Sequence, residues 1–383
     1  MDSTSKYLAR YAEPQTSEHL VDRRYRAALI VPAYDESPSA INQLVLTAED
    51  NDALLIVVVN APSNAPAERI ATTGSLLDYC LNHPSNHLLP INCLTNPLPR
   101  RQGVGLARKI GCDIAINLYA QGHIESPWIY TSDADAALPK NYFTHPLSDS
   151  GAHVFSHRHL SSDATLQSAV NVYDQHMAYY VAGLEYAGSQ YAYPTLGSTI
   201  AIHATTYAQI RGFPKRNAAE DFYLLNKAAK VAEVRFTPDV EITLEARVST
   251  RVPFGTGPAL ASILEQNSPY LSYNFRAFEA LKTTLAAFDD FADTGVLKID
   301  PELFDVISSL GWQDREARFV EGYQPTQRKR VVHDWFDALK TLQFMHHSAD
   351  VFPDAPLLET IATLPSLVVA TINRHLPREL HHK

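Results

Sequence analysis

Two aspartates one residue apart, Asp133 and Asp135, follow a short run of apolar and β-branched residues at 128–131. In an extended segment alternate side chains point to the same side, so both carboxylates can reach one point. Mg²⁺ and Mn²⁺ prefer such oxygen ligands, and they commonly take one or two carboxylates together with water and substrate phosphates. A solvated turn is the plainer explanation, because Asp is common in turns. The position of the pair directly after a strand favours a metal site.

Three arginines are candidates for binding the phosphates of a substrate. Arg247 and Arg251 flank a short segment that runs into Val252–Gly257. A glycine-containing loop beside an arginine can bind a diphosphate through backbone N–H groups and a bidentate guanidinium. An ordinary surface loop explains the same residues equally well. Arg108 lies on a predicted helix after Arg100–Gly103, where the alternative is a solvated helix face, and here we favour the phosphate contact.

A second acidic pair, Glu220 and Asp221, stands at the start of a predicted helix over 219–231. Acids in the first turn are favoured by the helix dipole and can cap the helix, which is the structural explanation for the pair. The functional alternative is general base catalysis, because a carboxylate within reach of a substrate hydroxyl can accept its proton.

The first half of the chain alternates between predicted strands and helices. Apolar, β-rich runs indicate strands at Ala27–Pro32, Leu54–Asn60, Leu88–Leu94 and Trp128–Thr131. Helices are indicated over Glu68–Leu81 and by the four-residue spacing of Leu106, Ile110, Ile114 and Leu118. This alternation predicts an α/β fold with a mainly parallel sheet. In such sheets ligands bind at the carboxyl ends of the strands, which is where Asp133 and Asp135 stand.

The pattern changes along the second half of the chain. Predicted strands at Ser198–His203 and Val240–Leu244, with the helix over 219–231 between them, continue the α/β pattern. Beyond about residue 258 apolar residues recur every three to four positions, which predicts amphipathic helices. We therefore divide the chain into a polar N-terminal arm at 1–25, an α/β domain at 26–257 and a helical C-terminal extension at 258–383.

Composition excludes several classes of protein. Of the 383 residues 45% are hydrophobic and 19% charged, which suffices for a full core and excludes disordered and collagen-like chains. The formal net charge of -10 disfavours nucleic acid as a partner. Three cysteines without a C-x-x-C pair disfavour a zinc site and a disulfide framework. No apolar stretch approaches the ~20 residues that span a bilayer, so we expect a soluble, cytoplasmic protein, with peripheral membrane contact left open.

The acidic loop resembles the D-x-D motif of GT-A fold glycosyltransferases, specifically those of family 2, with Pro139 following as in that family. Three further segments match in the same order. They are the opening strand and P-x-Y-N-E loop at Val31–Glu36, the A-R-N-x-G helix at Gly103–Gly111, and the acceptor half at Gly197–His203, Gly212–Pro214 and Glu220–Asp221. The resemblance covers about residues 27 to 255, and it implies a GT-A-like nucleotide-sugar-binding sandwich for this part of the chain.

The resemblance also implies roles for residues. Asp135 contacts the metal most directly, Asp133 lies on the same metal or on the ribose, and Asp221, preceded by Glu220, is the general base. Contacts to the nucleotide sugar are implied for Pro32, Ala33, Asp35, Glu36, Asn60, Arg108, Asp133, Arg247 and Arg251. The chain departs from the family at Asp35, where Asn is usual, and at Asn60, where Asp is usual, so the nucleotide base stays open.

Together with these residues, the resemblance implies a metal-dependent hexosyltransferase that uses Mn²⁺ or Mg²⁺. It transfers a sugar from a nucleotide-diphosphate donor to an acceptor hydroxyl, with inversion. The acceptor, whether a small molecule, a lipid or a glycan, is not indicated. A retaining glycosyltransferase on the same fold and a non-catalytic nucleotide-sugar-binding module are the alternatives. A nucleotidyltransferase is disfavoured, because Pro32–Glu36 lacks the glycine-rich loop that such enzymes carry after the first strand.

Overall fold

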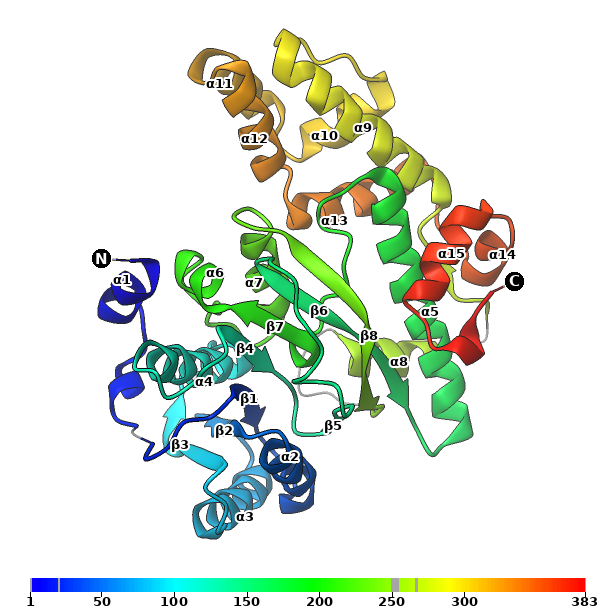
Figure 1. Ribbon diagram of the computed structural model, residues 1–383. Coiled ribbons are helices and arrows are strands. Elements are labelled where there is room, and N and C mark those ends of the chain that lie inside the picture. The colour runs from blue at the N-terminus through cyan, green and yellow to red at the C-terminus, as the bar shows by residue number, and fades with distance from the viewer. Residues whose placement is uncertain (1, 20, 249–254, 266–267, 383) are drawn as a thin grey trace. The chain divides into compact units, whose positions relative to one another are not determined.

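The computed structural model describes residues 2–19, 21–248, 255–265 and 268–382, and the chain forms two compact units. Unit 1 comprises Met1–Gln167 and Thr195–Leu260, and unit 2 comprises Ser168–Pro194 and Ala261–Lys383. Figure 1 shows strands gathered in unit 1 and helices dominating unit 2. Among the described residues no helix is both long enough and apolar enough to cross a membrane.

Unit 1 is built on an eight-stranded sheet with the strand order β3-β2-β1-β4-β7-β6-β8-β5. The strands are β1 (Ala27–Ala33), β2 (Ala53–Pro62), β3 (Leu88–Leu98), β4 (Trp128–Thr131), β5 (Ala136–Ala137), β6 (Ala152–Leu160), β7 (Ile200–His203) and β8 (Val234–Glu245). Four neighbouring pairs are parallel, and the antiparallel pairs are β4–β7, β6–β7 and β5–β8. The predicted α/β fold with a mainly parallel sheet is therefore confirmed.

Helices cover both faces of the parallel strands. One face of β1 and β2 presents Leu29 and Leu55 to a core shared with α2 (Pro38–Asp50) and α3 (Ala67–Asn82). The opposite face carries α4 (Gly103–Ala120), whose Gly111 lies so close that an added Cβ would stand 2.5 Å from a methyl of Ile30. In Figure 1 α4 lies on the other side of these strands from α2 and α3. Burial on both faces explains why β1 and β2 are apolar at almost every position.

The N-terminal residues are folded onto the same helix α4. They form α1 (Ser3–Arg10) and a 3-10 turn, Pro14–Ser17. Buried Tyr7 from α1 receives a hydrogen bond from Lys109 Nζ and donates one to Asp113, and both partners lie on α4. Lys109 also pairs with Asp113 at 2.8 Å, so this buried cation has its counter-charge one helical turn away.

The remaining helices of unit 1 lead to and from the second half of its sheet. They are α6 (Ala204–Gln209), α7 (Glu220–Ala228) and the 3-10 turn Gly197–Thr199. That turn occupies the first residues of the strand expected from Ser198, so β7 begins only at Ile200. Two helices have residues in both units, α5 (Ala164–Ala187) and α8 (Thr256–Glu265).

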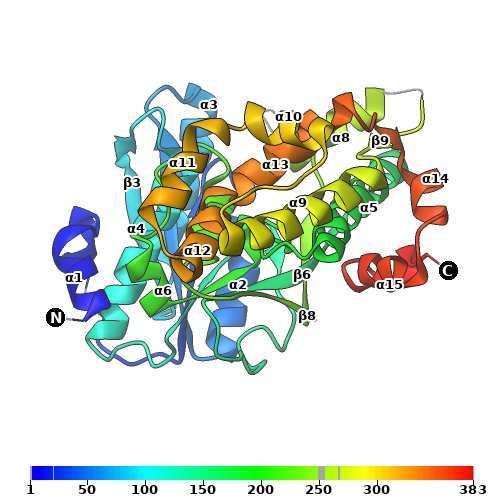
Figure 2. The ribbon, with the colours of Figure 1, turned by 90° about the horizontal axis from the view of Figure 1, so that it is seen from above.

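Unit 2 is helical, as the spacing of apolar residues after 258 predicts. Its helices are α9 (Phe275–Thr294), α10 (Pro301–Ser309), α11 (Gln313–Gly322), α12 (Pro325–Trp335), α13 (Ala338–His347), α14 (Leu357–Ala362) and α15 (Ser366–Arg374), with a small ladder of β9 (Leu271–Ser272) and β10 (Ala355–Pro356). Figure 2 shows α12 beside α9. Phe278 of α9 packs on α5, because an added Cβ on Gly183 would stand 2.5 Å from its ring. Trp312 is fully buried at the centre, stacked on Phe288 with ring centroids 5.0 Å apart.

Candidate functional site

The predicted acidic loop lies where the strand order of the sheet reverses. From β1 the chain proceeds to β2 and β3 on one side, and it then returns to β4 on the other side of β1. The loops that leave the carboxyl ends of β1 and β4 therefore stand next to each other at a topological switch point. In open α/β sheets this is the place where ligands bind.

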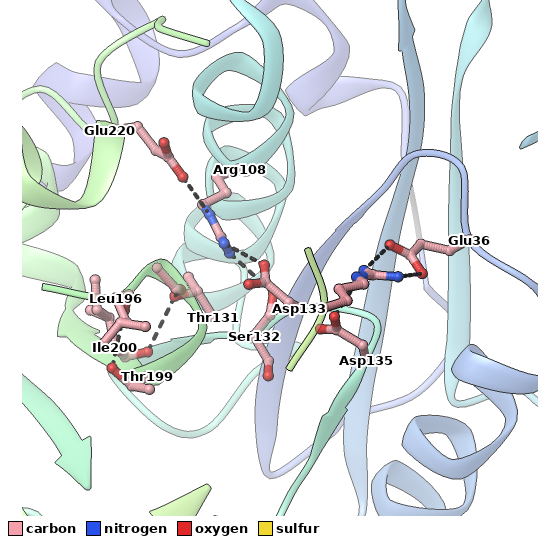
Figure 3. A network of polar contacts seen from close by, with 12 residues as sticks. Glu36, Arg108, Thr131, Ser132, Asp133, Asp135, Leu196, Thr199, Ile200 and Glu220 are labelled. Atoms are coloured by element: carbon pink, nitrogen blue, oxygen red, sulfur yellow. Dashed lines mark hydrogen bonds and ion pairs between the residues drawn. The ribbon is translucent and has the colours of Figure 1, made fainter. Parts of the chain in front are cut away.

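Arg247 joins these two loops. Its guanidinium donates to both carboxylate oxygens of Glu36, after β1, at 2.6 and 3.3 Å. The same group lies 2.8 Å from Oδ2 of Asp135, after β4. The pairing of β5 with β8 explains the meeting, because Ala136 lies opposite Leu244 and fixes the end of β8 beside the acidic loop. In Figure 3 Glu36 and Asp135 lie on one side of Asp133, and Arg108 lies on the other.

A second arginine, Arg108 on α4, joins the acidic loop to the start of α7. It donates to Asp133 Oδ1 at 2.5 Å, to the Ser132 carbonyl at 3.0 Å and to Glu220 Oε1 at 3.0 Å. Its side chain is only 3% exposed. The sequence predicted a phosphate contact for Arg108, whereas here all three guanidinium nitrogens are directed to oxygens of the protein (Figure 3).

Close packing holds Arg108 in this position. An added Cβ on Gly197 would stand 2.7 Å from its Nη2 and 2.9 Å from its Cζ. Thr131 Oγ1 donates to the Gly197 carbonyl at 2.6 Å, which ties the glycine to the end of β4. Position 197 therefore has to lack a side chain. The sequence analysis notes Gly197 and Ser198 but does not predict that this glycine lies against Arg108.

Two carboxyl groups of the site have raised pKa values. Burial raises the pKa of Asp135 to about 6, with Asp133 and Glu36 adding to the effect and Arg247 opposing it. Burial and the neighbouring Glu220 raise the pKa of Asp221 to about 7, opposed by the Phe222 N–H, which donates to Asp221 at 2.7 Å, and by Arg108. Both shifts have the causes expected for carboxylates crowded in a partly dry place.

The site contains more acids than bases. Five carboxyl groups, those of Glu36, Asp133, Asp135, Glu220 and Asp221, interact with two guanidinium groups, Arg108 and Arg247. An excess of three acidic groups over basic ones favours a cation. Glu36, Asp133 and Asp135 offer the hard oxygen atoms that Mg²⁺ or Mn²⁺ takes, and Arg247 already lies between two of them as a positive group.

Two residues next to the site have strained backbone. Asp35 precedes Glu36 with φ 59°, and Ala219 precedes Glu220 with φ 57°. Few residues with a side chain adopt this left-handed conformation, although Asp and Asn do so more readily than most. Asp at position 35 therefore adopts this conformation at modest cost. Alanine lacks the polar side chain that makes this conformation easier for Asp and Asn, so Ala219 is strained. Backbone strain of this kind clusters at functional sites.

Other predicted site residues lie outside this cluster. Asn60 is buried, and its amide donates to the carbonyls of Ala33 and Val58 at 3.3 and 3.0 Å, which ties the ends of β1 and β2. Asp35 is directed to α3, where its N–H donates to Thr73 and its carboxylate lies 3.3 Å from Arg69.

The backbone positions predicted to meet the nucleotide lie within a strand, since Pro32 and Ala33 belong to β1. The predicted contact of Arg251 lies outside the described residues. The site as described therefore has two halves, the acidic loop with Arg247 and the start of α7 with Asp221, and Arg108 connects them. No protein-family model matches the chain, and the search of curated proteins finds no match either.

Proposed function

We propose that the protein is a metal-dependent glycosyltransferase that transfers a sugar from a nucleotide-diphosphate donor to an acceptor hydroxyl, with inversion at the anomeric carbon. The observation that carries the proposal is the meeting of Glu36, Asp133 and Asp135 at the switch point of the sheet, with Arg108 joining Asp133 to Glu220, the neighbour of Asp221. It agrees with the motif resemblance, which supplies the GT-A fold and the donor class.

The acidic loop serves the leaving group. Breaking the bond between the sugar and the diphosphate leaves negative charge on the diphosphate, and groups that stabilise this charge accelerate the reaction. Asp135, Asp133 and Glu36 would hold Mn²⁺ or Mg²⁺, which neutralises that charge as a Lewis acid. Arg247 stands beside the same carboxylates, so its guanidinium is placed to contact the diphosphate oxygens as well.

Asp221 serves the acceptor. In the inverting reaction the acceptor oxygen forms its bond to the anomeric carbon while the diphosphate departs, and the hydroxyl proton passes to a base. A carboxylate with a pKa near 7 is a good acceptor for that proton at neutral pH. Glu220 is held by Arg108 at 3.0 Å and so fixes the first turn of α7, which carries Asp221.

A ligand-binding screen tests the proposal. Melting of the protein is measured with UDP-, GDP-, dTDP- and ADP-sugars, each with and without Mn²⁺. A donor at a hundred times its Kd stabilises the folded protein by about 2.7 kcal/mol. We expect one base to give this stabilisation only with Mn²⁺.

Asp135→Ala is the matched variant for this screen, because it removes a proposed metal ligand that lies in the loop between β4 and β5 and leaves the strands intact. The variant should melt near the wild-type temperature and lose the Mn²⁺-dependent shift. If it keeps the full shift, Asp135 is not a metal ligand. If no nucleotide sugar shifts the wild-type protein, the donor class is wrong.

The configuration of the product tests the stereochemistry separately. Once a donor is found, NMR of the anomeric carbon distinguishes inversion from retention. A retained configuration would favour the retaining alternative, which uses the same acidic loop and does not need Asp221 as a base.

A further inference from the structure

Arg247 occupies the position of a cation between two carboxylates of the site. It contacts both oxygens of Glu36, at 2.6 and 3.3 Å, and Oδ2 of Asp135 at 2.8 Å. The two acids are only 10% and 16% exposed at their side chains, whereas the arginine is 36% exposed. Arg247 therefore reaches in from a more open place and supplies positive charge to two nearly buried acids.

Resting on the function proposed above, we infer that Arg247 makes the binding of the divalent cation depend on the diphosphate of the donor. A cation that binds Asp135 Oδ2 has to displace a guanidinium from the same oxygen. The displaced group keeps its two contacts with Glu36, but it loses the ion pair with Asp135. Without the diphosphate, the metal therefore competes with the Arg247 guanidinium for Asp135 Oδ2.

The diphosphate removes this penalty. Its anionic oxygens accept hydrogen bonds from the N–H groups of Arg247 that no longer contact Asp135. A guanidinium and a phosphate can form two such bonds at once. Metal and diphosphate then each improve the binding of the other by the same factor, because coupling between two ligands is reciprocal. Arg247 is in this sense a specificity-determining residue, which selects the metal–diphosphate complex over the free metal.

Three proteins test the inference: the wild type, Arg247→Met and a control, Arg235→Met. Arg235 is the natural control because it stands near the other end of β8 and also pairs with a glutamate, Glu233, at 2.6 Å. That pair is more exposed, at 42% and 57%, and it does not touch the acidic loop. Both substitutions remove one positive charge from the same strand region, so they change the overall charge equally.

Binding of Mn²⁺ is measured by electron paramagnetic resonance of the free ion, with and without inorganic pyrophosphate. Pyrophosphate is the probe because it carries the diphosphate chemistry without a base or a sugar. Its complex with Mn²⁺ in solution is common to all three proteins and cancels in the comparison. Melting curves of the three proteins check that each is folded.

We expect Arg247→Met to bind Mn²⁺ alone about fivefold or more tightly than the wild type, a factor at the lower end of usual coupling between sites. Pyrophosphate should tighten Mn²⁺ binding clearly in the wild type and in Arg235→Met, and much less in Arg247→Met. A fourth protein, Arg247→Lys, should bind Mn²⁺ alone with an affinity between those of the wild type and Arg247→Met, since an ammonium group cannot span two carboxylates as a guanidinium does.

Three results would overturn the inference. Mn²⁺ affinity that is unchanged or weaker in Arg247→Met would show that the arginine does not compete. An increase of the same size in the Mn²⁺ affinity of Arg235→Met would show that the effect comes from the overall charge of the protein. Absence of Mn²⁺ binding in every protein, with and without pyrophosphate, would remove the proposed metal-dependent function itself, and the screen with nucleotide sugars would then show no effect of Mn²⁺.

Discussion

Each of the two units contains a deeply buried arginine, and the two differ in what surrounds them. Arg108 in unit 1 donates to two carboxylates and one backbone carbonyl. Arg328 in unit 2 donates to four backbone carbonyls, those of Ala292, Phe319, Val320 and Tyr323, at 3.0 to 3.3 Å. Both arginines are engaged with protein oxygens, so burial alone does not separate them.

The partners of Arg328 come from the ends of helices. Ala292 lies in the last turn of α9, and the other three carbonyls belong to the last turn of α11 and the residue that follows it. The last carbonyls of a helix have no partner within the helix and carry the negative end of its dipole. Arg328 therefore completes two helix ends, which is a structural task.

The partners of Arg108 carry full charges and exceed it in number. Asp133, Glu220 and, at longer range, Asp221 all act on one guanidinium. Carboxylates that are left in excess are costly for the fold unless they bind a proton, a metal or a substrate. A buried arginine is thus a sign of function where its partners are titratable and too many, and a sign of helix capping where they are carbonyls.

The largest effect should come from the excess acid itself. Asp221→Asn keeps the shape of the side chain and cannot accept a proton, so it should lower kcat by about 10²–10⁴-fold while the affinity for the donor changes little. Steady-state kinetics with the donor found in the screen measure both. Turnover near the wild-type rate would mean that Asp221 belongs with the structural groups of the molecule.

The comparison of the arginines can be tested by replacing each with Met. Arg108→Met leaves carboxylates without their counter-charge, and Arg328→Met leaves carbonyls without a donor, and we expect each to lower the free energy of unfolding by about 3 kcal/mol at pH 8. At pH 5 the loss in Arg108→Met should shrink, because carboxyl groups can take up protons. The loss in Arg328→Met should stay the same, because carbonyls do not titrate.

Denaturant unfolding at the two pH values gives these differences. Arg108→Lys adds a control that keeps the charge but not the three-way geometry, and it should recover only part of the stability. Equal pH dependence in both Met variants would contradict the distinction drawn between the two arginines.

A smaller effect is expected at the glycine that lies against Arg108. In Gly197→Ala the added methyl would stand 2.7 Å from Nη2, so the guanidinium has to move away from Asp133 or Glu220. Overpacking of this kind costs about 1–3 kcal/mol. Gly188→Ala serves as the comparison for added methyl groups, since nothing lies within 4 Å of a Cβ there, although its φ of +79° brings strain of its own. Only Gly197→Ala should also weaken Mn²⁺-dependent binding of the donor.

How much of this could be predicted from sequence depends on the range of the interactions. The strands β1, β2 and β4 and the helix α4 follow from local runs and spacings, and their alternation predicts the parallel part of the sheet. The strand β3 continues to Leu98, past its predicted end at Leu94. The helix α7 ends at Ala228, before its predicted end at residue 231. The sequence analysis does not predict β6 or α5. The segment of β6 shows no clear alternation, whereas α5 carries Leu166, Val170, Tyr173, Met177 and Val181 at helical spacing, a signal that could have revealed it.

The acidic residues of the candidate site could be picked out from the sequence, but the arginines that pair with them could not. Asp133, Asp135 and Asp221 stand out by type and by position after strands or at a helix start. The pairing of Arg247 with Glu36 joins residues 211 positions apart and depends on the register of β5 against β8. The phosphate contact of Arg108 stays a prediction, and the sequence could not show that Glu220 and Asp133 both lie within reach of its guanidinium.

The smallest effect concerns the stability of the fold as a function of pH. Asp221 has a pKa of about 7 in the folded protein and, as an ordinary aspartate, near 4 when unfolded. Below pH 4 the group is protonated in both states, so the stability it contributes is fully present there. As pH rises through 7 the folded protein has to lose that proton in a crowded, partly dry place, and this stability is lost. Asparagine at position 221 cannot ionise. The free energy of unfolding of Asp221→Asn, relative to that of the wild type, should therefore increase between pH 5 and pH 8 by about 1 kcal/mol once solvent screening is allowed for.

Denaturant unfolding at pH 5 and pH 8 measures this increase. A difference between variant and wild type that is the same at both pH values would show that the charged Asp221 costs the fold nothing. The excess of acids that separates the Arg108 cluster from the surroundings of Arg328 would then be neutralised by groups other than Asp221.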